Sequence, residues 1–163
     1  MLDSSEDSVK SALKRARATI EQLHPAQDRE RAPEPNSLRE RELVRRFAEA
    51  WVADDIDGVV TLLTDNAWFT MPPSPLEYQG RVSIGTFLRE VETWRGGLHY
   101  RLIPTRANSQ PSFGCYREDD HTPVAHAVGL LVLTLEGDRI GAITNFVDSS
   151  VLPRFGLPRI LHD

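Results

Sequence analysis

Two side chains of this sequence have the chemistry of a proton-transfer site, His126 and Asp148. An imidazole or a carboxylate in apolar surroundings can act as a general base near neutral pH. If residues 123–135 form a strand, the side chain of His126 shares a face with those of Val128, Leu130 and Val132. Two other interpretations stay open: His126 is a hydrogen-bonded interior histidine, and Asp148 caps the turn that follows it.

The sequence lacks the motifs of other common kinds of catalytic or binding site. The sequence has no glycine-rich phosphate loop, no nucleophile elbow and no set of residues at metal-ligand spacing. Its single cysteine, Cys115, lies in a strand-like stretch and is predicted to belong to the core, with a redox role as the alternative. We therefore predict neither a metal nor a cofactor.

Length and composition indicate one folded domain with an appendage. Of the 163 residues, 40% are hydrophobic and 26% are charged, and the net charge is −5. A chain of this length can bury a core, and its negative charge argues against nucleic-acid binding by overall charge. It contains no apolar run of about 20 residues and no signal-peptide core, so we expect a cytoplasmic protein without a membrane segment.

The folded domain is predicted to occupy residues 38–163. Apolar residues recur at helical spacing over 38–52 and 81–95, and a short helix is expected after Asp54–Asp55. Strand-like runs follow the pattern of half-buried strands at 67–72, 98–107, 112–118, 123–135 and 138–148, with a tight hairpin at Gly137–Asp138. Helices followed by strands predict an α+β fold. The apolar tail after the last strand either covers the sheet or contacts a partner.

The first 37 residues differ in character from the rest. Residues 24–37 contain three prolines and no large apolar side chain, which is typical of a linker. Before them, apolar residues from Val9 to Leu23 follow the spacing of one helix face. Such a helix is too short to be stable alone and needs a partner. Its four positive charges are either a solvated basic face or a nucleic-acid contact.

The string SALKRARATI at residues 11–20 resembles the end of the DNA-binding region of extracytoplasmic-function sigma factors. In a helix-turn-helix unit the recognition helix enters the major groove, with base contacts near its N-terminus and cations at the phosphates. The resemblance implies DNA-binding roles for Ser5, Glu6, Ser8, Lys10, Lys14, Arg15 and Arg17. The supporting helices of that unit and the polymerase-binding region do not precede residue 1, so we expect the chain to be a fragment of a longer protein.

Residues 38–158 resemble the nuclear transport factor 2 fold in its SnoaL-like branch, in which helices pack on a curved antiparallel sheet to form a cone with a pocket. MPPSPLEYQGR at 71–81 and LPRFGLP at 152–158 are similar to the C-terminal domain of certain actinobacterial sigma factors. The resemblance implies a pocket for a small hydrophobic ligand, or alternatively an aromatic core, built from Trp51, Trp68, Tyr78, Trp94, His126, Asn145 and Asp148. It also implies one of two uses for the open face of the sheet: formation of a homodimer, or, in a domain appended to a sigma factor, a contact within the same protein.

Together the two resemblances predict the C-terminal portion of an RNA polymerase sigma factor, with core polymerase and promoter DNA as partners in the full-length protein. The SnoaL-like domain is expected to modulate sigma activity and to be capable of sensing a small ligand. The alternative is a stand-alone SnoaL-like isomerase, cyclase or hydrolase with His126 or Asp148 as its base. The basic helix on its linker favours the sigma factor, because such an enzyme has no need of it.

Overall fold

The computed structural model describes residues 30–95, 99–119 and 122–162. The chain separates into two units, Met1–Glu30 and Arg31–Asp163, and the helices and strands of the described residues belong to the second. The predicted DNA-recognition helix and the first part of the predicted linker lie outside the described residues. Within those residues, no helix combines the length and the hydrophobicity needed to cross a membrane.

Helix α2 (Leu38–Val52) begins where a serine caps it and ends after four turns. The Oγ atom of Ser37 accepts a hydrogen bond from the backbone N–H of Glu40 at 3.2 Å, which satisfies one of the free donors of the first turn. One face of the helix is buried against the sheet and carries Leu43, Phe47 and Trp51. The prediction of a helix over 38–52 is confirmed.

Two further helices complete the layer. The short helix α3 (Ile56–Thr61) is capped by Asp55, whose Oδ1 accepts a hydrogen bond from the Gly58 N–H at 2.9 Å. Helix α4 (Arg81–Arg95) buries Ile84 and Leu88. Both helices lie where the sequence predicts them.

In the part of the chain that the structure describes, seven strands form one sheet, in the order β2-β1-β6-β5-β4-β3, with β7 paired to β5. The strands are β1 (Leu63–Thr70), β2 (Glu77–Gln79), β3 (Tyr100–Ala107), β4 (Gln110–Asp119), β5 (Thr122–Glu136), β6 (Arg139–Phe146) and β7 (Ile160–His162). The expectation of an antiparallel sheet needs one correction, because β1 pairs with β6 in parallel. After β2 the chain passes through α4 to the far edge of the sheet, where β3 lies. It then returns through the antiparallel pairs β3–β4, β4–β5 and β5–β6, which places β6 beside β1 and in the same direction.

Left-handed backbone residues set two of the turns in this meander. The turn between β5 and β6 has Gly137 at φ 57°, as the predicted hairpin requires. The turn between β3 and β4 consists of Asn108 and Ser109, with φ values of 49° and 67°. Two successive residues with positive φ are typical of a type I′ hairpin, and β4 therefore starts at Gln110 instead of residue 112.

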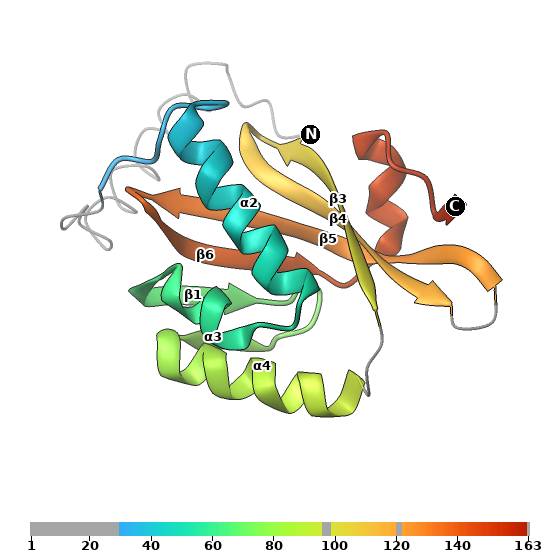
Figure 1. Cartoon of the computed structure of the whole chain (residues 1–163), viewed down its shortest axis with the longest axis horizontal. Coiled ribbons are helices and arrows are strands. Elements are labelled where there is room, and N and C mark those ends of the chain that lie inside the picture. Colours follow the sequence, from blue (N-terminus) through green and yellow to red (C-terminus); the bar gives the residue numbers. More distant parts are fainter. Residues whose placement is uncertain (1–29, 96–98, 120–121, 163) are drawn as a thin grey trace, which may run out of the picture. The chain divides into compact units, whose positions relative to one another are not determined.

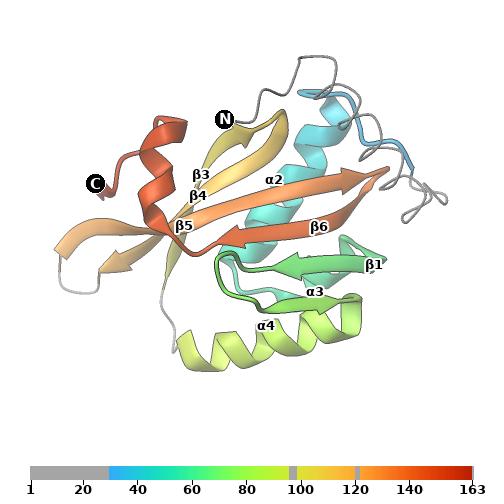
Figure 2. The same cartoon turned by 180° about the vertical axis from the view of Figure 1, so that it is seen from behind.

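Apolar side chains are buried on both faces of the sheet. Helix α2 lies across one face (Figure 1), and the reverse view shows the strands in front of it (Figure 2). On the helix side, α2, α3 and α4 bury one large cluster that includes Phe47, Phe69 and Leu131. On the opposite face, the 3₁₀ segment η1 (Ser149–Phe155) and the residues after it bury a second cluster with Leu152 and Leu157. Of the two interpretations of the apolar tail, the structure supports the one in which it covers the sheet.

Candidate functional site

Two of the predicted pocket residues, Trp51 and Tyr78, pack into the core on the helix side of the sheet. The ring centroid of Trp51 lies 6.5 Å from that of Phe69 and 5.4 Å from that of Phe47. The ring of Tyr78 stacks on Phe87 at 4.1 Å. These contacts correspond to the alternative interpretation, in which the aromatic residues build a core.

The other two tryptophans do not face this core. Trp68 is 36% exposed and follows a buried residue, Ala67, on β1, so it points to the opposite face of the sheet from its buried neighbour Phe69. Trp94 is 91% exposed, and the prediction that it lines a pocket is wrong. The last turn of α4 extends beyond the strands that the rest of the helix covers (Figure 1).

His126 lies on β5 between β4 and β7, opposite Arg117 and Ile160, with an exposed side chain. The register of β4 and β5 shifts between Cys115 and Tyr116, so one residue of β5 is inserted there. As a result, Val128 packs in the helix-side cluster while Leu130 and Val132 pack on the other face. The prediction that His126 shares a face with all three is therefore wrong.

Asp148 is the N-cap of η1. Its Oδ1 accepts a hydrogen bond from the Ser150 N–H at 2.8 Å, and its Oδ2 accepts one from the Ser150 hydroxyl at 2.7 Å. These two bonds, the hydroxyl first, hold the pKa of the Asp148 carboxyl below its ordinary value. A carboxylate with a lowered pKa is a weaker base, so the cap interpretation accounts for Asp148 better than a catalytic role does.

The predicted site residues are thus dispersed over the domain. Asn145 is half-buried on β6, and none of the seven predicted side chains lines any of three surface cavities formed by described residues, which are lined mainly by β3–β6 with η1, by α2 with α3, and by α2 with β3. Cys115 is buried in the helix-side cluster, as predicted. Within the described residues, no three histidine, cysteine or acidic side chains are grouped so that they could hold a metal ion. The predicted DNA-binding residues, Ser5 to Arg17, lie outside the described residues.

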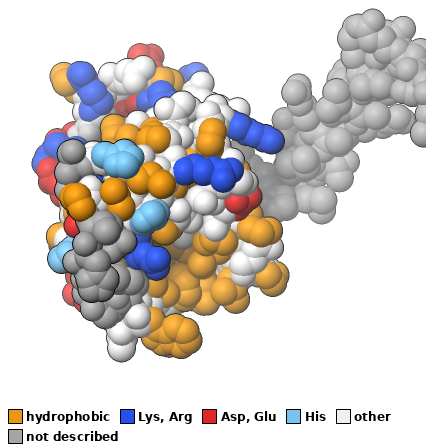
Figure 3. Space-filling view, turned by 90° about the vertical axis from the view of Figure 1, so that its right-hand side faces the viewer, with side chains coloured by type: hydrophobic (Ala, Val, Ile, Leu, Met, Phe, Trp, Pro, Cys, Tyr) orange, Lys and Arg blue, Asp and Glu red, His pale blue; other side chains and the backbone are white. Residues whose placement is uncertain are grey.

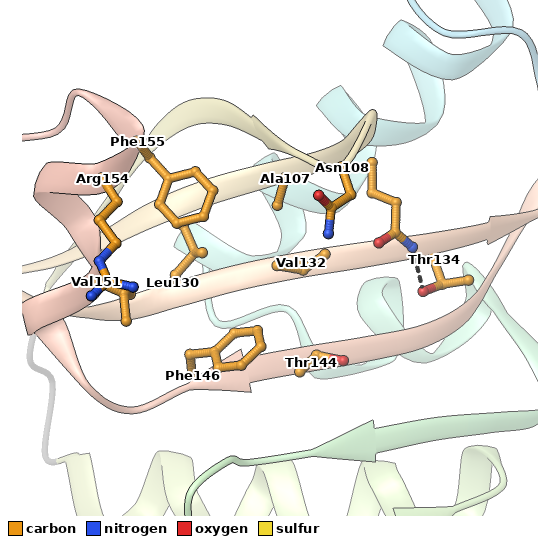
Figure 4. A pocket seen from close by; sticks show the side chains of 11 residues that line it. Ala107, Asn108, Leu130, Val132, Thr134, Thr144, Phe146, Val151, Arg154 and Phe155 are labelled. Atoms are coloured by element: carbon orange, nitrogen blue, oxygen red, sulfur yellow. Dashed lines mark hydrogen bonds between the residues drawn. The ribbon is translucent and has the colours of Figure 1, made fainter. Parts of the chain in front are cut away.

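An apolar cavity among the described residues lies on the face of the sheet opposite α2, between β3–β4, β5, β6 and η1. We call it the sheet pocket; its volume is about 360 Å³. Its middle is apolar, and Figure 4 shows the side chains that line it there: Leu130, Val132, Phe146, Val151 and Phe155. Strand residues two apart share a face, so this wall follows from the alternation of β5 and β6.

The two ends of the sheet pocket are polar but differ in charge. Arg154 lies beside Val151 at one end, whereas Asn108, Thr134 and Thr144 lie at the other (Figure 4). At that neutral end, Gln110 Nε2 donates a hydrogen bond to Thr134 Oγ1 at 2.8 Å. The sequence signals the apolar wall through its alternation, but it does not show that the C-terminal segment brings Arg154 to the wall.

A buried ion pair lies on the other side of the domain. Glu40 is only 4% exposed, and Arg106 of β3 donates hydrogen bonds to both of its carboxylate oxygens. The backbone N–H of Asn36 donates to Glu40 Oε1 at 2.9 Å. The hydrogen bond from Arg106 is the largest cause of a lowered pKa of Glu40, and burial opposes it. This pair fixes the start of α2 to the β3–β4 hairpin. Because both oxygens of the Glu40 carboxylate accept hydrogen bonds from Arg106, we do not assign Glu40 a role as a general base.

Comparison with known proteins gives one strong sequence relationship. No protein-family model matches the chain. The ECF RNA polymerase sigma factor SigG of Mycobacterium tuberculosis, in the strains CDC 1551 / Oshkosh and H37Rv, is 33% identical over 159 residues. The alignment covers 96% of this chain, and the chain spans 42% of the length of these curated relatives.

Solved structures resemble the described domain in fold. A SnoaL-like protein of unknown function from Burkholderia thailandensis has a TM-score of 0.53 and 20% identity, covering 71% of this chain and 99% of its own. An NTF2-like protein of unknown function from Mesorhizobium loti has a TM-score of 0.56 and 18% identity, covering 71% and 96%. An LEH-like epoxide hydrolase of M. tuberculosis has a TM-score of 0.53 and 17% identity, covering 74% and 90%. These similarities extend to the fold alone.

The predicted cone of helices on a curved sheet is therefore confirmed, and the sequence relationship extends across both the N-terminal segment and the folded domain. Over 96% of its length the chain is similar to the ECF RNA polymerase sigma factor SigG, and its folded domain has the same fold as SnoaL-like and NTF2-like proteins.

Proposed function

We propose that the chain works as the C-terminal portion of an ECF sigma factor in transcription initiation. The observation that carries the proposal is the 33% identity to SigG over 96% of the chain. An alignment of that length includes the basic N-terminal segment and the SnoaL-like domain together. We assign residues 1–23 to the end of the DNA-binding region, 24–37 to a linker and 38–163 to the SnoaL-like domain.

In this proposal the N-terminal segment contributes to promoter binding in the cytoplasm. Ser5, Glu6, Ser8 and Lys10 lie at or near base edges, and Lys14, Arg15 and Arg17 lie near phosphates or another protein surface. Core RNA polymerase and promoter DNA are the partners of the full-length protein. Four clustered cations alone give weak binding, so the segment depends on the rest of the sigma factor for its function.

The SnoaL-like domain is proposed to modulate sigma activity through a protein contact. Two large apolar residues of α4 are exposed, Trp94 at 91% and Val82 at 84%. Viewed from the right-hand side of Figure 1, the surface shows a broad gathering of hydrophobic side chains on one side (Figure 3). Exposed tryptophan is typical of interaction hot spots, and contiguous apolar surface is typical of contact sites.

The test is to end the gene at Pro35 in the source cell and to measure transcription from a promoter that depends on this sigma factor. We expect promoter-dependent transcription to change while the amount of core polymerase stays constant. A point variant, Trp94→Ala, separates a contact through α4 from loss of the whole domain. Unchanged transcription and unchanged polymerase affinity after truncation would contradict the modulating role of the domain.

The size of the native protein provides a second test. Antibody raised against residues 38–163 should detect a band well above 18.4 kDa, the mass of this chain. A single band at the mass of the chain would contradict the proposal that it works as a portion of a larger sigma factor.

A further inference from the structure

The sheet pocket has the dimensions and the lining of a small-molecule site. Ligand pockets are concave and mainly apolar, with a few polar groups that fix the orientation of the ligand. At about 360 Å³, the sheet pocket falls within the range of about 300–1,000 Å³ that such sites have. Its lining comes from four separate parts of the chain, which are the β3–β4 hairpin, β5, β6 and η1.

The middle of the sheet pocket favours an extended apolar group. Leu130 and Val132 of β5 are buried, and Phe146 of β6 lies beside them. Val151 and Phe155 of η1 close the wall from the other side (Figure 4). An alkyl chain laid along this wall would lose its contact with water on binding, which is the main source of affinity for apolar ligands.

The charge at one end selects the head group. Among the described residues that line the sheet pocket, Arg154 is the only ionisable one. Among the described residues, no hydrogen bond or ion pair engages its guanidinium group. A guanidinium presents two parallel N–H donors that match the two oxygens of a carboxylate. An amine at the same place would meet a like charge and would be rejected.

The opposite end selects a neutral hydrogen-bonding group. Asn108 carries an amide there, and Thr134 and Thr144 carry hydroxyls. Thr134 Oγ1 already accepts a hydrogen bond from Gln110, and Thr70 Oγ1 lies 3.4 Å from Thr144 Oγ1. These groups can bind a hydroxyl or a carbonyl, but none of them carries a charge.

We propose that the sheet pocket binds an unbranched or lightly substituted aliphatic monocarboxylate, with the carboxylate at Arg154 and the chain along Phe146 and Phe155. This ligand site lies on the face of the sheet opposite α2, and none of the seven predicted pocket residues lines it. Binding here goes beyond the transcriptional role proposed above and does not depend on it, so either proposal can fail alone.

The test is calorimetric titration of decanoate into the full chain without polymerase or DNA. We expect saturable binding with one site per chain, and weaker binding of decanol and decylamine, which have the same chain but no carboxylate. The variant Arg154→Gln should weaken decanoate roughly tenfold, the effect of losing one charge-assisted contact. Arg159→Gln is the matched control, because Arg159 is an exposed arginine nearby that does not line the sheet pocket.

A second variant tests the position of the chain. Ala107→Leu adds bulk at a half-buried position that lines the sheet pocket and should also weaken decanoate. Equal binding of decanoate and decylamine would overturn the proposal, as would unchanged affinity in Arg154→Gln or no binding at millimolar decanoate. If instead light scattering shows a dimer that Thr144→Arg converts to a monomer, and decanoate does not bind, the face serves self-association and the proposal is wrong.

Discussion

The guanidinium of Arg106 donates a hydrogen bond to each carboxylate oxygen of Glu40, at 2.8 and 3.0 Å. The same arginine also donates to the backbone carbonyl of Ser109 in the β3–β4 turn. One side chain thus connects the first turn of α2 with the hairpin at the far edge of the sheet. Because Glu40 is buried, the carboxylate depends on this arginine for compensation of its charge.

Removal of this arginine should therefore destabilise the domain. We expect Arg106→Ala to lower the free energy of unfolding by about 2–3 kcal/mol, below the full effect for a buried pair, because Arg106 keeps some exposure to water. Urea denaturation of the full chain measures the change. Arg45→Ala is the control: Arg45 pairs with Glu42 and Glu49 in an exposed network and should leave stability nearly unchanged. Equal effects of the two variants would contradict the role assigned to Arg106.

The same pair predicts the pH dependence of stability in acid. The pKa of Glu40 lies below its ordinary value of 4.5 in the folded protein, so the unfolded chain binds a proton more readily than the folded one. The ionised Glu40 therefore contributes its full stabilisation of the folded state above about pH 4.5, and this stabilisation is lost as the pH falls through the lowered pKa. Urea midpoints measured between about pH 3 and pH 6 should rise with pH, and Glu40→Gln should show a shallower rise. Parallel curves for the two proteins would exclude this source of the slope.

A comparison of the buried Trp51 with the exposed Trp94 tests how much the aromatic core contributes to stability. Trp51 packs between Phe47 and Phe69, so Trp51→Ala should cost about 3–5 kcal/mol of unfolding free energy. Trp94 is 91% exposed, so Trp94→Ala should change stability by less than about 0.5 kcal/mol. Thermal and urea denaturation compare them directly. A large loss in Trp94→Ala would mean that its side chain packs against the domain.

Alanine substitutions at Gly129 and Gly156 distinguish two costs: a steric clash of the added Cβ at Gly129, and backbone strain at Gly156. A Cβ at Gly129 would overlap the backbone carbonyl oxygen of Phe146, which the sheet holds in place, so Gly129→Ala should cost about 3 kcal/mol or more. Gly156 has φ 72° with no heavy atom within 4 Å of an added Cβ, so Gly156→Ala should cost only about 1–2 kcal/mol of strain. Chemical denaturation ranks the two variants. A larger loss of stability in Gly156→Ala than in Gly129→Ala would contradict this prediction, because it would show that β5 and β6 shift to accommodate the Cβ at position 129.

Local patterns predicted most of the fold. Helical spacing placed Leu43 and Trp51 on the buried face of α2, and Gly137 marked the last hairpin of the meander. Both features depend on residues that are close in sequence. The parallel pairing of β1 with β6 was not predicted, because it is set by where the chain returns after α4 and not by any local signal.

The candidate site was predicted less well for the same reason. One inserted residue at Val128 reverses the face of every later residue on β5, and no sequence pattern indicated it. The exposure of Trp94 depends on the length of α4 relative to the strands it covers. Arg154 and Phe146 line the same pocket only because η1 folds back over the sheet. Relationships of this kind come from tertiary packing, so residue types alone identify chemistry but not location.

The parallel contact between β1 and β6 also has a consequence for how the protein is made. Thr70 and Thr144 are 74 positions apart, and the strands that carry them are adjacent in the sheet. Long-range pairing of this kind slows folding, because the intervening chain must be ordered first. During synthesis, β1 and β2 leave the ribosome long before their partner strand. The edge of β1 that pairs with β6 therefore keeps its backbone hydrogen-bonding groups unpaired until nearly the whole domain has been translated.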